Sequence, residues 1–251
     1  TFGYDYAEGK GSEYVSPEAA EYYTTGGYYY PYGPQKNENR LLTLYANYNK
    51  MVESLNSNFD VTMGYDYQYW KSTTPETYSR NAAGETQTVF KASDERHTLL
   101  SYYGRLNYSY GSRYMLTATV RRDATSRFAA NQRWGTFPSI ALGWRLTEEG
   151  FMKNQKVLSN LKLRASYGVT GQQDGIGNYN YLPVYTLSQD GAQGIVGGIP
   201  IYTYRPEAYV SDLKWETTTS WNFGFDFGFL KDRLTGSLDF YTRKTKDLIA
   251  T

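Results

Sequence analysis

Cysteine is absent from this chain of 251 residues, and histidine occurs once, as His97. Without a thiol the chain forms neither a disulfide framework nor a thiolate metal site, and one imidazole does not build a multi-histidine centre. A Gly-x-Ser-x-Gly nucleophile elbow is also missing. We therefore expect no metal, no cofactor and no enzyme activity, and we predict that His97 is a polar surface residue.

Long apolar runs and a surplus of charge are missing too. Mean hydropathy is −0.66, and no stretch approaches the ~20 apolar residues of a membrane helix. Lys and Arg number 26 against 25 Asp and Glu, so the net charge is +1, which provides no field to attract nucleic acid. These features exclude a helical membrane protein and argue against nucleic acid as a partner.

Aromatic residues are abundant instead: the chain has 28 Tyr, 5 Trp and 11 Phe. Tyr and Trp combine an apolar ring with a polar tip. An excess of both suits a boundary between lipid and water, and it also suits a surface that grips sugars or peptides. Composition leaves both interpretations open.

Apolar and polar residues alternate with the period of two that is typical of β-strands. The clearest case places Trp221, Phe223 and Phe225 opposite Asn222 and Gly224. Most of these segments have the ~9 to 11 residues that a tilted strand needs to cross a bilayer. The predicted strands cover residues 40–50, 59–69, 98–110, 114–122, 134–146, 159–169, 215–229 and 233–246.

The predicted connections alternate between short and long. Long ones span residues 1–39, 70–97, 123–133 and 170–213, and short ones lie near 51–58, 111–112, 147–158 and 230–232. Outer-membrane barrels have short periplasmic turns and long outer loops. An all-β fold is therefore expected, a transmembrane antiparallel up-and-down β-barrel. A soluble sandwich would bury a face rich in Val, Ile and Leu, whereas this apolar face is heavily aromatic.

Several segments of the predicted strands and turns carry distinctive motifs: 104–110 (GRLNYSY), 116–123 (LTATVRRD), 126–128 (SRF), 133–139 (RWGTFPS), 142–145 (LGWR), 158–168 (LSNLKLRASYG), 171–172 (GQ), 213–218 (LKWETT) and 234–241 (LTGSLDFY). Together these segments resemble the SusC/RagA family of TonB-dependent transporters. They follow the family's order over most of residues 98–250, whereas the first 97 residues match only in general character.

The resemblance implies a 22-stranded outer-membrane barrel of Bacteroidetes-like bacteria, of which this chain would supply about 8–9 strands. It implies import of oligosaccharides or peptides with a SusD-like surface lipoprotein, powered by TonB through an N-terminal part. Residues 1–251 are expected to be barrel wall only, with no plug domain. Eight or nine strands closed on themselves, as an adhesin or anchor, remain an alternative. An outer-membrane hydrolase that depends on His97 is a third hypothesis.

The candidate contact residues lie in predicted outer loops, where rings stack on sugars or grip peptides, or else pack the loop or contact the lid lipoprotein. Asp123, with Arg122 and Arg127, either recognises a charged ligand or closes a loop by a salt bridge. Thr147 is expected to cap a short helix beginning with Glu148 and Glu149. The aromatic candidates are Tyr22, Tyr23, Tyr28, Tyr29, Tyr30, Tyr32, Tyr179, Tyr181, Tyr185, Tyr202 and Tyr204.

Overall fold

A computed structural model describes residues 1–16, 18, 28–187, 193–206 and 209–249. Most of them are in strands, which are joined by turns, by irregular segments and by the 3-10 turns η2 (Glu53–Leu55), η3 (Leu146–Glu148) and η4 (Gly150–Met152). Within this described part no helix is long and apolar enough to cross a membrane. The all-β prediction is confirmed.

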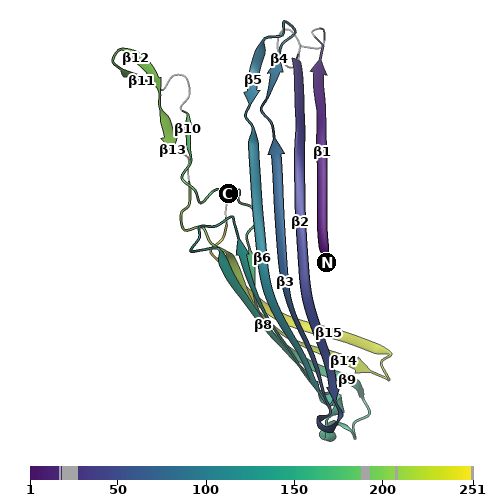
Figure 1. The fold of residues 1–251 in the computed structure, drawn as a ribbon. Helices are drawn as coiled ribbons and strands as arrows, with labels where there is room; N and C mark the ends of the chain where they lie inside the picture. Colours follow the sequence, from purple (N-terminus) through teal and green to yellow (C-terminus); the bar gives the residue numbers. More distant parts are fainter. Residues whose placement is uncertain (17, 19–27, 188–192, 207–208, 250–251) are drawn as a thin grey trace. The chain divides into compact units, whose positions relative to one another are not determined.

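One antiparallel sheet contains most of the strands (Figure 1). Its order is β15-β14-β9-β8-β7-β6-β3-β2-β4-β5, with β1 paired to β2. The order is a path with two ends, so the sheet is open. Its strands are β1 (Phe2–Val15), β2 (Tyr28–Val52), β3 (Ser57–Thr74), β4 (Thr77–Arg80), β5 (Thr86–Phe90), β6 (Ser93–Tyr110), β7 (Tyr114–Thr125), β8 (Trp134–Arg145), β9 (Leu158–Gln172), β14 (Glu216–Phe229) and β15 (Leu234–Lys246).

The chain divides into two compact units. The first unit comprises Thr1–Thr43 and Asp66–Leu99, and the second comprises Leu44–Tyr65 and Leu100–Thr251. The second unit also carries two short hairpins of two strands each. These pair β10 (Tyr185–Leu187) with β13 (Tyr204–Pro206) and β11 (Gln193–Val196) with β12 (Ile199–Tyr202).

The predicted long loops differ most from the structure. Residues 1–39 contain β1 and the first part of β2, residues 70–97 contain β4 and β5, and residues 170–213 contain the two short hairpins. Glycine and proline favour turns, yet β2 includes Pro31, Gly33 and Pro34. The reason is that β1 pairs with this part of β2, for example with Tyr14 opposite Tyr29. Pairing between distant segments overrides the local signal.

Few side chains are buried. Among the described residues, the buried hydrophobic ones are Phe128, Phe137 and Trp215. Large rings and aliphatic chains along the sheet are instead exposed, for example Leu142 at 54% and Phe240 at 65%. A soluble sandwich would cover such a face with a second sheet, so the burial pattern favours a single-layered wall.

Candidate functional site

The second unit's sheet separates its residues into two faces. Register pairs Leu116 with Leu142, Leu142 with Ala165, Ala165 with Phe223 and Phe223 with Phe240, so one apolar row crosses five strands. The two neighbouring rows on this side are also apolar or aromatic, apart from Thr242 on β15. We call it the apolar face; it includes Tyr114, Leu116, Ala118, Ile140, Leu142, Trp144, Leu163, Ala165, Tyr167, Trp221, Phe223, Phe225, Leu238 and Phe240.

Aromatic residues mark both ends of the apolar face on β8. Trp134 and Trp144 share its parity and stand at opposite ends of the strand. The two residues are about 33 Å apart along the strand. For a strand tilted by about 40°, this corresponds to about 25 Å along the barrel axis. That height matches the apolar band of an outer-membrane barrel. Trp144 stacks on Tyr114, and Trp134 stacks on Tyr102. The spacing of these rings fits two aromatic girdles.

The opposite side, which we call the polar face, carries charged and amide side chains. Arg164 on β9 forms ion pairs with Asp226 on β14 at 2.9 Å and Asp239 on β15 at 3.0 Å. The pair with Asp239 crosses Gly224, where an added Cβ would stand 2.5 Å from the Asp239 carboxylate. A glycine at this position leaves room for Arg164 to link three strands.

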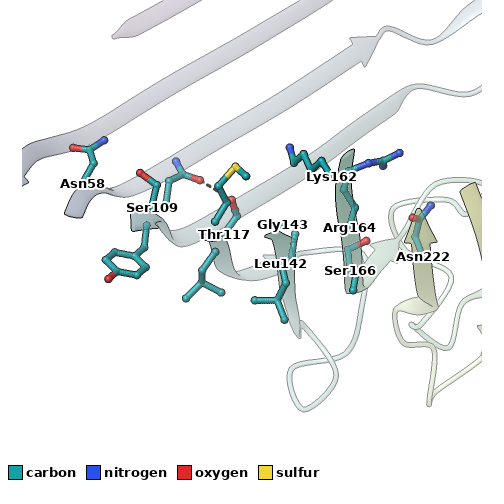
Figure 2. A pocket seen from close by; sticks show the side chains of 15 residues that line it. Asn58, Ser109, Thr117, Leu142, Gly143, Lys162, Arg164, Ser166 and Asn222 are labelled. Atoms are coloured by element: carbon teal, nitrogen blue, oxygen red, sulfur yellow. Dashed lines mark hydrogen bonds between the residues drawn. The ribbon is translucent and has the colours of Figure 1, made fainter. Parts of the chain in front are cut away.

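A groove of about 390 Å³ lies along the polar face. Figure 2 shows Lys162 and Arg164 on the side of the sheet away from Leu142. Lys162 extends over Gly143, with its Cε 3.2 Å from the position of an added Cβ. Thr117 donates a hydrogen bond to Asn107 at 2.9 Å beside it. The groove offers hydroxyls, amides and cations, which suits a polar solute or a polar protein surface.

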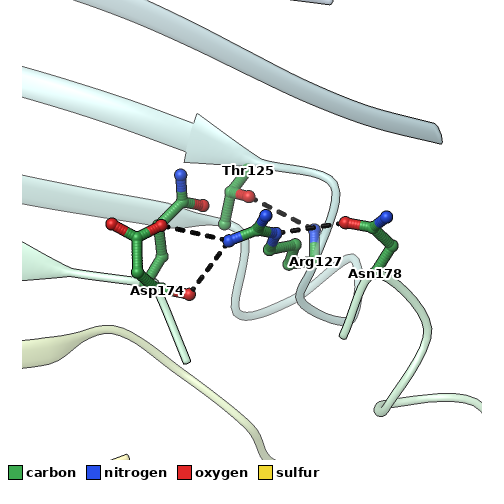
Figure 3. Close-up of polar contacts among 5 residues, drawn as sticks. Thr125, Arg127, Asp174 and Asn178 are labelled. Atoms are coloured by element: carbon green, nitrogen blue, oxygen red, sulfur yellow. Dashed lines mark hydrogen bonds and ion pairs between the residues drawn. The ribbon is translucent and has the colours of Figure 1, made fainter. Parts of the chain in front are cut away.

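Arg127 joins two loop bases in the second unit (Figure 3). Its guanidinium donates to the side chain of Asn178 at 3.1 Å, to the carboxylate of Asp174 at 3.2 Å and to the Gln173 carbonyl at 3.4 Å. The Arg127 amide donates to Thr125 Oγ1 at 3.2 Å. We call this set the Arg127 clasp, because it ties the β7–β8 connection to the segment that follows β9.

A small aromatic cluster begins at Phe128, the residue that follows Arg127 in the chain. Trp215 contacts Phe128 and Phe137 edge-on, with centroid distances of 5.6 and 5.2 Å. Its indole N–H donates to the Arg133 carbonyl at 2.9 Å. The Phe137 ring lies so close to Gly171 that an added Cβ would be 2.1 Å from the ring. The cluster is the second unit's main apolar core.

Asp123 is not paired with Arg122 or Arg127. It accepts two hydrogen bonds from Arg121 Nε, at 2.9 and 3.0 Å, and Arg121 also reaches Ser101 Oγ at 2.8 Å. Arg122 lies over the Trp134 ring at 4.9 Å. Residues two apart on a strand share a face, so Arg121 and Asp123 meet while Arg122 points to the other side.

The tyrosines at the start of β2 form a packed row rather than a loop. Along the strand, the rings of Tyr28, Tyr30 and Tyr32 follow one another at a tilt, with centroid distances of 6.4 and 6.0 Å, and the Phe90 ring lies 4.5 Å from Tyr30. Tyr29 points to the other side of the strand, and it and Tyr32 are exposed. Tyr22 and Tyr23 lie outside the described residues.

The later candidates are spread over separate elements. Tyr179 lies in a turn in which its carbonyl accepts from Leu182 N at 2.9 Å, and Tyr181 follows it. Tyr202 ends β12, whereas Tyr185 and Tyr204 lie on β10 and β13. These last three rings are exposed. The structure thus groups the β2 tyrosines but does not gather the remaining candidates into one site.

His97 differs from the prediction of a surface residue. It is buried, and its ring stacks on Trp70 with centroids 4.8 Å apart and planes 9° apart. The Trp ring excludes water from one side of the imidazole. Within the described residues no group of three His, Asp or Glu side chains is placed to hold a metal ion.

The family model described as "TonB dependent receptor-like, beta-barrel" matches residues 1–251. The chain belongs to this family. The open sheet is accordingly part of a receptor barrel, and the predicted partial barrel is confirmed. The receptor is of the SusC/RagA type, as the sequence motifs predicted.

Two curated relatives support the assignment. The chain is 42% identical to TonB-dependent receptor SusC of Bacteroides thetaiotaomicron over 99% of its length and 25% of the relative's. It is 38% identical to TonB-dependent receptor P39 of Formosa agariphila over 68% of its length and 15% of the relative's. The chain therefore spans about a quarter or less of the length of these relatives.

Solved structures agree on the fold. The chain matches the RagAB peptide transporter with a TM-score of 0.80 at 24% identity, covering 98% of this chain and 28% of the other. A RagAB peptide importer in its open-open state gives a TM-score of 0.79 at 24% identity, over 97% and 27% of the two chains. At this identity the likeness concerns the fold alone.

Sequence reasoning missed the polar-face residues. Lys162, Arg164 and Asp226 occupy the polar positions of predicted strands, and their alternation was the available signal. The ion pair of Arg164 with Asp239 depends on strand register, which the sequence does not display. Trp215 lies within the motif 213–218, which by itself indicates no role for the ring.

Proposed function

We propose that this chain is part of the wall of an outer-membrane, TonB-dependent importer that takes up oligosaccharides or peptides together with a SusD-like lipoprotein. Its relatives supply the class of receptor, and one of them is named SusC. RagAB, whose fold this chain shares, is described as a peptide transporter, and this supports peptides as one of the two proposed cargo classes. The proposed process is transport without covalent chemistry.

The two-faced sheet is the observation that carries this proposal. Leu142 and Phe223 are each 54% exposed on the apolar face. Side chains of this kind exposed over five strands are costly in water and favourable in lipid. The polar face, with Lys162, Arg164 and Asp239, suits a hydrated lumen. A barrel wall with lipid on one side and a polar passage on the other satisfies both faces.

Within this proposal the aromatic candidates contact cargo or lid. Tyr29, Tyr32, Tyr202 and Tyr204 expose their rings, and a flat ring stacks equally well on a sugar or on a peptide side chain. Tyr28, Tyr30, Tyr179 and Tyr181 would position their neighbours. Asp123 and Arg127 hold the strand end and the loop base through their ion pairs.

Purification of the full-length receptor from its native outer membrane in mild detergent tests the proposal. Mass spectrometry should find the peptide covering 134–139 in a much larger polypeptide, accompanied by a lipoprotein. Cells that lack the gene should lose uptake of a labelled oligosaccharide mixture or of a labelled peptide mixture. A lone chain of 28.7 kDa would contradict the importer and favour the small closed barrel.

A further inference from the structure

The connection between β8 and β9, residues 146–157, has a defined structure of its own. It contains η3 and η4 in place of the helix expected after Thr147, and no side chain caps either turn. Backbone bonds close the turns, from Glu149 N to Leu146 O and from Met152 N to Glu149 O, both at 3.0 Å. Gln155 Oε1 accepts from the amides of Val157 and Leu158 at 2.9 and 2.7 Å. We call this segment the connector.

Glu149 ties the connector to the apolar face. Its Oε1 accepts from the Tyr114 hydroxyl at 2.6 Å and from the Trp144 indole N–H at 3.0 Å, and its Oε2 accepts from Arg113 at 3.3 Å. Tyr114 and Trp144 both belong to the apolar face. Their polar tips mark the level at which lipid meets water, because such rings keep the tip hydrated and the body in the acyl chains.

The connector exposes apolar side chains at that level. Phe151 is 70% exposed and Val157 is 68% exposed. Lys153 and Lys156 lie between them in sequence and are exposed; within the described part neither forms an ion pair. A lysine beside a buried apolar group extends its stem along the lipid and keeps the ammonium at the surface. The pattern is that of an interfacial anchor.

We propose that the connector inserts into the surface of the bilayer, with Phe151 and Val157 among the outer acyl groups and Lys153 and Lys156 at the phospholipid phosphates. The occupant of this surface is the phospholipid bilayer, because the exposed groups continue the apolar face and Glu149 holds them beside its aromatic rim. The inference rests on the proposed membrane location of the barrel.

Fluorescence of a bimane label in the full-length receptor, reconstituted in phosphatidylcholine and phosphatidylglycerol vesicles, tests this inference. Three single-cysteine variants are compared, Phe151→Cys, Val157→Cys and Leu142→Cys, with Ala83→Cys in the exposed turn between β4 and β5 as the aqueous reference. Quenching is measured with phosphatidylcholine carrying a nitroxide near the headgroup, with the same lipid carrying it at the chain end, and with iodide. The exposed positions of Phe151 and Val157 leave the fold undisturbed by the change.

Labels at 151 and 157 should be quenched several-fold more than the label at 83 by the headgroup nitroxide and several-fold less by iodide. Iodide-dominated quenching at both positions would overturn the anchor. The label at 142 then separates the two claims, because quenching there by the chain-end nitroxide upholds the membrane barrel. Iodide quenching at 142 would count against the proposed function itself.

Discussion

At the scale of single residues, glycines set how closely strands and rings approach. Gly171 leaves no space for a Cβ beneath the ring of Phe137, whereas Gly104 on β6 has nothing within 4 Å of the same position. The ring is held by Trp215 on its edge and has little freedom to retreat. The two glycines, both in strands of one sheet, thus differ in whether the structure leaves room for a side chain.

Gly171→Ala should destabilise the full-length receptor by about 1–3 kcal/mol, the usual cost of overpacking a core. Gly104→Ala is the matched control and should change stability by less than about 0.5 kcal/mol, as surface substitutions do. Thermal unfolding in detergent, followed by tryptophan fluorescence, measures both. Equal midpoints for the two variants would show that Phe137 does not pack on Gly171 as described.

Glu149 provides a pH-dependent contact outside the strands. Hydrogen bonds from Tyr114, then from Trp144, and the charge of Arg113 hold the pKa of its carboxyl below the ordinary value of 4.5. A lowered folded-state pKa means that the contact stabilises fully above the unfolded pKa and that this contribution is lost as pH falls through the folded pKa.

Glu149→Gln should therefore lower the unfolding midpoint of the receptor at pH 7, and the difference from the wild type should shrink as the pH falls below about 4.5, the unfolded carboxyl range. Glu148→Gln is the control, since the Glu148 side chain is exposed and makes no hydrogen bond or ion pair within the part of the chain that the structure describes. Thermal unfolding from pH 7 to pH 3 measures the difference. A difference that grows on acidification would have the wrong sign for this contact.

At the scale of elements, alternation of apolar and polar residues predicts strands best where it is uninterrupted in the sequence, because it then shows which face of the sheet each residue occupies. Residues 221–229 lie in β14, and the chain returns antiparallel through β15, as the alternation of aromatic and polar residues predicts. The first 39 residues were predicted as loop because Gly, Pro and polar residues interrupt the alternation; their strands arise from pairing between β1 and β2. Arg127 and Asp174 also meet only through tertiary structure, so the sequence did not reveal the clasp.

The Arg127 clasp should control the mobility of the segment that follows β9. Arg127→Gln removes three side-chain donors, and hydrogen bonds involving a charged group contribute about 1.5–3 kcal/mol each. Amide hydrogen exchange over residues 173–182 should then rise by at least about tenfold, the equivalent of 1.4 kcal/mol. Asp174→Asn should act more weakly, because Asp174 is 73% exposed and exposed ion pairs contribute little.

Exchange is measured by mass spectrometry on the full-length receptor. Peptides from β8 and β9 should keep their protection in both variants and serve as internal controls. Unchanged exchange over residues 173–182 in Arg127→Gln would show that the segment is held by other contacts.

At the scale of the whole molecule, the sheet is a wall that needs neighbours. Within the described residues β15 pairs on one side only, with β14, and an unpaired edge in lipid leaves backbone groups without hydrogen bonds. The chain spans about a quarter of the length of SusC. Further strands of a longer receptor would satisfy this edge and place the polar face around a common lumen.

The most direct test of this account compares two adjacent residues on β8. Leu142 belongs to the apolar face and Ala141, one position earlier, to the polar face. Nitroxide labels at Leu142→Cys and Ala141→Cys in the full-length receptor are measured by electron paramagnetic resonance in lipid bilayers. Oxygen should relax the label at 142 much more than a water-soluble nickel chelate does, and this preference should be absent at 141. Equal preference for the chelate at both positions would contradict a membrane wall.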